Sequence, residues 1–127
     1  MTTRNLDLVR RGYEAAATGD LDAVASLLDD DVRWHAAGDE TGGCQNRRET
    51  LEWMRDAITR GTRIELLDAR ELQDGRVLVL LQRTAPGQGE AEMPPPHGQI
   101  LSFRDGRITD MAVFATAQEA TAAAEAV

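Results

Sequence analysis

The chain has 127 residues, of which 42% are hydrophobic and 28% are charged, so we expect one domain, residues 1–127, with a substantial core. Its formal net charge is −8, which makes nucleic acid and anionic membranes unfavourable partners. The longest apolar run, residues 77–81, is too short to cross a bilayer. The N-terminus lacks the apolar core of a signal peptide, so we expect a cytoplasmic location.

The basic residues and the cysteine give further information about the source of the protein and its need for a disulfide or a metal. All 14 basic residues are Arg, which together with abundant Ala and Gly suggests a GC-rich bacterial source. Cys44 is the single cysteine, so no intramolecular disulfide can form, and two His residues complete no zinc-binding cluster. We therefore expect neither a metal nor another cofactor.

The first half of the sequence predicts three helices and one strand. Apolar residues at helical spacing predict a helix over residues 3–18, which ends at Gly19. Asp20 is a predicted N-cap for a second helix. The acidic residues 29–31 are predicted to form a solvated turn before a strand over residues 32–36. Residues 46–49 have the spacing of a capping box, which starts a third helix.

The second half predicts four strands and a terminal helix. The strands cover residues 62–72, 76–84, 97–104 and 107–115, with tight Asp-Gly turns at residues 74–75 and 105–106. A Gly- and Pro-rich loop is expected over residues 85–96. A second capping box, residues 116–119, opens a short C-terminal helix. The order of elements indicates an α+β fold with an antiparallel sheet.

The last predicted hairpin indicates which side chains share a face of the sheet. A two-residue turn at 105–106 pairs Arg104 with Arg107, and regular alternation then places one set of residues together. That set is His97, Gln99, Leu101, Phe103, Ile108, Asp110, Ala112 and Phe114. It is mainly apolar with a few polar groups, as expected of a small-molecule site. The opposite face would carry Ile100, Ser102, Arg104, Thr109, Met111 and Val113.

Three polar residues of this set are candidate catalytic groups. Desolvation in an apolar cavity would raise the pKa of Asp110 and suit it to general acid/base catalysis, although it could instead be solvated or paired with an Arg. Gln99 is a candidate hydrogen-bond partner for a carbonyl or enolate-like oxygen, or a satisfied polar group of the sheet. His97, after three prolines, would lie at the cavity mouth or in an exposed loop.

Other elements supply candidate binding residues. Tyr13 lies on the apolar face of the first predicted helix, where it either packs or offers its hydroxyl to a cavity. In the strand over residues 76–84, Gln82 is predicted to share a face with Leu78 and Leu80. The candidate set for substrate contact also includes Trp34, Trp53, Leu101, Phe103, Ala112 and Phe114.

Residues 9–34 carry a family resemblance. Here a helix ends at Gly19, another opens at Asp20, an acidic triplet follows, and a strand begins at Val32. This run resembles the SnoaL-like and ketosteroid-isomerase-like branch of the nuclear transport factor 2 superfamily. The resemblance implies a cone built from three helices and a curved antiparallel sheet around an apolar ligand cavity. It also implies a homodimer formed through the sheet.

The resemblance also assigns side chains to the cavity. It places Trp34 inward and His35 outward, aligns Trp53 with a cavity-lining aromatic residue, and aligns Gln99 with a position that helps stabilise an oxyanion. However, the general base and the oxyanion tyrosine of the isomerases fall on Ala36 and Gly12, and the acid/base aspartate of the polyketide cyclases falls close to Thr116. The epoxide hydrolases of the family use an Arg and two Asp residues, of which residues 83–84 and 110 offer at most a fragment.

Two hypotheses follow for the function. In the first, the protein is a cofactor-free isomerase, cyclase or hydrolase that acts on a hydrophobic oxygenated molecule such as a polyketide or terpenoid. Asp110 would then move a proton while Gln99 and His97 polarise an oxygen. In the second, the protein is a non-catalytic ligand-binding or dimerisation module with the same fold. Fold alone does not separate them.

Overall fold

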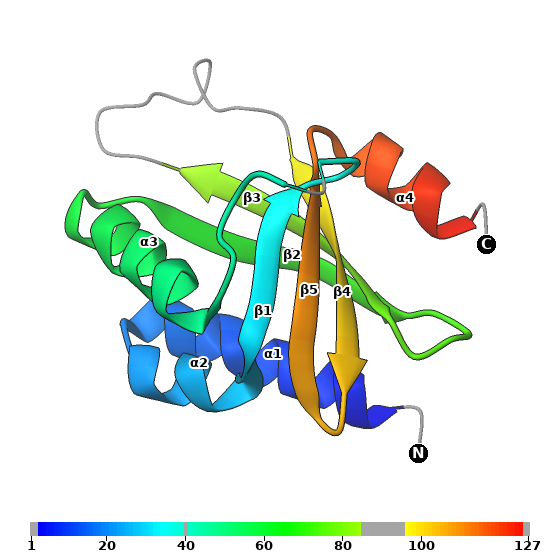
Figure 1. The fold of residues 1–127 in the computed structure, drawn as a ribbon. Coiled ribbons are helices and arrows are strands. Elements are labelled where there is room, and N and C mark those ends of the chain that lie inside the picture. Colours follow the sequence, from blue (N-terminus) through cyan, green and yellow to red (C-terminus); the bar gives the residue numbers. More distant parts are fainter. Residues whose placement is uncertain (1–2, 40, 85–95, 126–127) are drawn as a thin grey trace.

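The computed structural model describes residues 3–39, 41–84 and 96–125 (Figure 1). In chain order the elements are α1 (Thr3–Thr18), α2 (Leu21–Leu27), β1 (Leu28–Ala36), α3 (Arg47–Thr59), β2 (Arg63–Glu71), β3 (Val77–Thr84), β4 (His97–Arg104), β5 (Arg107–Phe114) and α4 (Ala117–Glu125). The predicted order of elements and the α+β class are confirmed. Most of the predicted loop at 85–96 lies outside the described residues.

Short polar side chains start the helices where the sequence predicts. The Asp20 carboxylate accepts a hydrogen bond from a backbone N–H of the first turn of α2. Gly19, just before it, has a φ of 79°, which glycine adopts without steric cost. Asn46 caps α3 by accepting from the Glu49 N–H at 2.9 Å. The Glu49 carboxylate reaches back to the Gln45 N–H, also at 2.9 Å, one residue earlier than a capping box would have it.

The described strands form one curved, unclosed sheet in the order β1-β5-β4-β3-β2. Neighbouring strands are antiparallel except β1 and β5, which are parallel. The expectation of a wholly antiparallel sheet is therefore wrong, and the sheet is mixed. The reason lies in the connection. After β1 the chain crosses to the far edge of the sheet and returns through four antiparallel strands, so β5 arrives beside β1 in the same direction.

The acidic residues 29–31 belong to β1 and do not form the predicted turn. The apolar residues on either side, Leu28 and Val32, are both buried in the core. Burying both side chains extends the backbone between them along the sheet edge, where its register with β5 shifts. The Asp29 carboxylate accepts hydrogen bonds from the Asp31 N–H at 3.0 Å and from Arg104 at 3.3 Å.

The two faces of the sheet are covered by different helices (Figure 1). Helices α1, α2 and α3 lie on the inner, concave face, where Val79, Leu81 and Leu101 are buried with residues of α1 and α2. Helix α4 lies on the outer face and packs against Leu78 and Ile100. Within the part of the chain that the structure describes, no helix combines the length and apolar character needed to cross a membrane.

Candidate functional site

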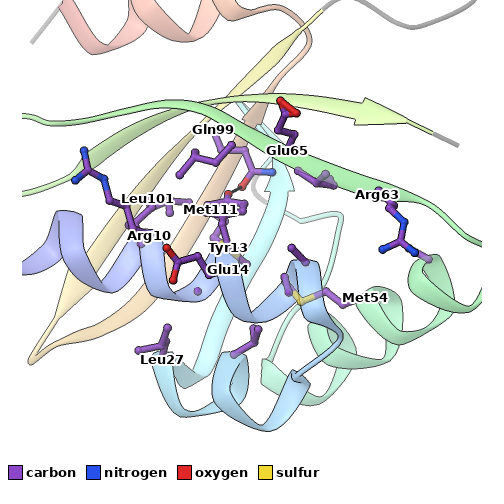
Figure 2. Close-up of a pocket in the computed structure, with 18 of the residues that line it drawn as sticks. Arg10, Tyr13, Glu14, Leu27, Met54, Arg63, Glu65, Gln99, Leu101 and Met111 are labelled. Atoms are coloured by element: carbon purple, nitrogen blue, oxygen red, sulfur yellow. Dashed lines mark hydrogen bonds between the residues drawn. The ribbon is translucent and has the colours of Figure 1, made fainter.

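A cavity of about 1110 Å³ lies between the inner face of the sheet and the three N-terminal helices (Figure 2). This volume is at the upper end of the range for small-molecule sites. Its lining is mainly apolar and includes Val9, Ala16, Val24, Leu27, Leu28, Met54, Ala57, Ile64, Leu66, Leu101, Ile108 and Met111. Such a lining favours a ligand with a large apolar surface.

Two polar side chains meet inside this apolar surround. Gln99, on β4, is only 4% exposed, and Figure 2 shows it pointing toward Tyr13 of α1. The Tyr13 hydroxyl donates a hydrogen bond to Gln99 Oε1 at 3.5 Å, which is long for this type of bond. Burial raises the pKa of the Tyr13 phenol above its ordinary value. Tyr13 therefore stays neutral and keeps its proton to donate.

An aromatic pair forms another part of the cavity wall. Trp34 of β1 and Trp53 of α3 both line the cavity. Their ring centroids are 4.6 Å apart with an interplanar angle of 74°, which is the favoured edge-to-face geometry. The pair offers a flat apolar surface to a ligand, and Trp34 points inward as the resemblance implies.

Charged groups of the cavity lie where water reaches them. Arg10, Glu14, Arg63 and Glu65 line it from α1 and β2, and all four residues are exposed. The buried polar groups of the cavity are therefore neutral. Among residues 3–39, 41–84 and 96–125, no group of three or more His, Cys, Asp or Glu side chains is placed to hold a metal ion.

The helical layer, the curved sheet and the apolar cavity between them match the cone that the resemblance implies, except that β1 pairs with β5 in parallel. The family model of the SnoaL-like domain matches residues 9–111. The chain belongs to the SnoaL-like domain family. A search of curated protein sequences found no match.

Solved structures with the same fold include several relatives of this SnoaL-like protein. Bal32a, from a soil-derived mobile gene cassette, is 25% identical with a TM-score of 0.74 over 89% of each chain. A candidate polyketide cyclase from Xanthomonas campestris pv. campestris is 23% identical with a TM-score of 0.68, over 92% of this chain and 93% of that chain. An LEH-like epoxide hydrolase from M. tuberculosis is 18% identical with a TM-score of 0.68, over 97% of this chain and 86% of that chain.

The structure brings half of the predicted site residues of this SnoaL-like protein to the cavity. The residues that line it are Tyr13, Trp34, Trp53, Gln82, Gln99 and Leu101. The predicted residues that are not part of the lining are Leu80, His97, Phe103, Asp110, Ala112 and Phe114. Leu80 and Phe114 pack with α4 on the outer face, whereas Phe103 packs against the inner core.

A bulge in the last hairpin explains three of these six differences. The predicted pairs Arg104–Arg107 and Phe103–Ile108 are present, but Asp110 pairs with Ser102. Thr109 is therefore an extra residue in β5. Side chains alternate along a strand, so one extra residue reverses the face of every residue after it. The predicted register beyond Ile108 is wrong: Met111 lines the cavity, and Asp110, Ala112 and Phe114 do not.

Asp110 meets His35 instead of the cavity. The two residues lie on neighbouring strands, and Asp110 Oδ1 is 2.8 Å from His35 Nε2. The other ring nitrogen, Nδ1, is 2.9 Å from the carbonyl oxygen of Ala36. Because both nitrogens face oxygen atoms, neither is directed at a ligand. The pair links edge strand β1 to β5.

His97 is half-buried at the start of β4, where it pairs with Leu81 of β3. Burial, and to a smaller extent the nearby Arg83 guanidinium, lower the pKa of the His97 ring below its ordinary value. Burial raises the pKa of the Cys44 thiol above its ordinary value.

Sequence reasoning missed several lining residues, including Met54, Leu66, Leu67 and Met111. Met54 was detectable, because it lies on the predicted apolar face of the third helix. Met111 and Leu67 were not detectable, because Met111 follows the bulge in β5 and Leu67 lies within the bulge in β2. A bulge breaks the alternation of apolar and polar residues, but the sequence alone does not show which residue the opposite strand skips.

Proposed function

We propose that this protein binds a mainly apolar small molecule that carries a neutral oxygen, such as a polyketide- or terpenoid-like ketone. Tyr13 and Gln99 would hold the oxygen, and the aromatic pair and aliphatic lining would hold the apolar body. The observation that carries the proposal is the partly buried contact between Tyr13 and Gln99 inside a mainly apolar cavity of about 1110 Å³. A carbonyl oxygen of the ligand would accept a hydrogen bond from the phenol. A hydroxyl group of the ligand, if present, would donate to the amide oxygen.

A second candidate function is catalysis on the same ligand. The phenol can donate through its O–H and the amide through its N–H groups. Donors held in an apolar site stabilise the negative charge that develops on a carbonyl oxygen during enolisation. Tyr13 would then act as the electrophile of a cofactor-free isomerase or cyclase. The proton that leaves the α-carbon would pass to one of the exposed carboxylates that line the cavity, which are Glu14, Glu65 and Asp68.

The test uses fluorenone and fluorene, which differ in one carbonyl oxygen. Trp34 and Trp53 are the only tryptophans of the chain and both line the cavity, so quenching of their fluorescence reports occupancy. We expect fluorenone to bind about fivefold tighter than fluorene, as one net hydrogen bond would give. Tyr13→Phe and Gln99→Met should each reduce this preference, whereas Gln118→Met, at an exposed position on α4, should not.

Two outcomes decide between the candidates. If neither compound quenches the fluorescence, or if Tyr13→Phe keeps the full preference for fluorenone, the binding proposal is wrong. Catalysis is measured separately as exchange of the α-protons of an enolisable ketone in D₂O. Exchange that depends on Tyr13 supports an enzyme, and binding without exchange supports a ligand-binding module.

A further inference from the structure

The exposed large apolar side chains all belong to the cavity lining. Among the described residues these side chains are Trp53, Ile58 and Leu67, at 44%, 38% and 48% exposure. All three line the cavity. Trp53 and Ile58 come from α3, and Leu67 comes from β2. We call these three residues the apolar rim, because they are the large apolar side chains of the cavity lining that water reaches.

The position of Leu67 depends on a second bulge. Leu66 pairs with Leu81, and Asp68 pairs with Leu80, so Leu67 is an extra residue in β2. Bulges often redirect a side chain next to a binding site. Among the strands that the structure describes, β2 is also an edge of the sheet, so none of them pairs with its outer side. The bulge therefore leaves a large apolar side chain at the mouth of the cavity.

Leu67 of the rim lies two strands away from Gln99. Gln99 pairs with Val79 of β3, and Val79 pairs with Ala69 of β2. Two strand spacings, about 10 Å in total, separate Gln99 from the strand that carries Leu67. A ligand that reaches both the polar pair and the rim must be elongated.

We propose that the apolar rim is a subsite for the trailing end of the ligand. The ligand class is a neutral amphiphile with one oxygenated end and an apolar body at least about 10 Å long. The oxygen enters first and meets Tyr13 and Gln99, while the trailing end covers Ile58 and Leu67. This inference rests on the proposed function. The leading end is neutral because burying a charged group beside the neutral phenol and amide would be costly.

The test is a series of straight-chain methyl ketones measured by isothermal titration calorimetry. We expect the affinity of the unmodified protein to rise about fourfold for each added methylene until the chain covers the rim. Leu67→Ser should lower the ratio of long-chain to short-chain affinity about tenfold, since the long chain loses its contact with half of a leucine side chain. Leu67→Met should keep most of that ratio. Ile58→Ser provides a second, independent variant on α3.

The outcomes separate this inference from the proposed function. If Tyr13→Phe has no effect on any ketone, the proposed function fails. If Tyr13→Phe weakens every ketone but Leu67→Ser and Ile58→Ser leave the ratio unchanged, the rim subsite is wrong and the proposed function stands. Light scattering on the same samples tests whether a second copy of the chain, instead of a ligand, covers the rim. A dimer that Leu67→Ser converts to monomer would show that a second copy covers the rim, and would overturn the subsite.

Discussion

Single residues decide which polar groups reach the cavity. Thr109 is inserted in β5 without a partner in β4, and this turns Asp110 from the cavity toward His35. Gln99 lies before the insertion in the hairpin and keeps its inward position beside Tyr13. The acid/base chemistry that the sequence suggests for Asp110 therefore has no geometric support inside the cavity, whereas a neutral donor pair does.

The variant Asp110→Asn tests this division of roles. The side chains of His35 and Asp110 are 11% and 36% exposed, so their contact is partly screened by water. We expect a loss of about 1 kcal/mol in the free energy of unfolding, at the low end for a hydrogen bond to a charged group. Ketone affinity should change by less than about twofold, corresponding to under 0.4 kcal/mol. Urea unfolding and fluorescence titration measure the two quantities, and a loss of binding as large as that of Tyr13→Phe would place Asp110 in the site.

At the level of elements, α4 approaches the sheet closely over one glycine. A Cβ atom added at Gly98 would lie 2.4 Å from the Ala120 Cβ and 3.2 Å from the Val79 carbonyl oxygen. Gly98 and Ala120 are both buried. The short side chains on the two surfaces therefore allow α4 to pack on the outer face without disturbing β4.

Gly98→Ala should force α4 away from β4 and lower the free energy of unfolding by about 1–3 kcal/mol, as overpacked cores do. The partner variant Ala120→Gly removes the atom that would clash. In the double variant we expect part of the loss to be recovered, so that the two changes are not additive. Thermal and urea denaturation of the four proteins measure this coupling. Simple additivity would mean that the two residues do not meet.

At the scale of the whole molecule, His97 makes stability depend on pH. Its folded-state pKa is lowered by burial and by Arg83, so the unfolded chain binds a proton more readily than the folded one. The contribution of His97 is complete above the unfolded pKa of about 6.5. It is lost as the pH falls from there through the lowered folded pKa.

We therefore expect the free energy of unfolding to fall as the pH drops below about 6.5, with a smaller fall in the variant His97→Gln. The carboxylates of Asp29, Asp39 and Asp74 have lowered pKa values through hydrogen bonds to backbone N–H groups, so their contribution is lost at still lower pH. Urea unfolding of both proteins across this range gives the difference. Parallel curves would show that His97 is not responsible.

Local signals in the sequence determined the elements and the family. Asp20 and Asn46 start helices because their side chains bond to the nearest free N–H groups, and this needs no distant contact. The hairpin turn at residues 105–106 is equally local. The positions of Tyr13, Trp34 and Gln99 in the cavity follow from these elements and from the resemblance.

Only the tertiary structure decided how the strands meet. The bulges at Thr109 and Leu67 and the parallel pairing of β1 with β5 depend on contacts between distant segments. Side chains alternate with a period of two, so one inserted residue exchanges the two faces of a strand. For this reason the sequence identified an apolar cavity with a glutamine in it, and the structure alone placed Asp110 outside and Leu67 at the rim.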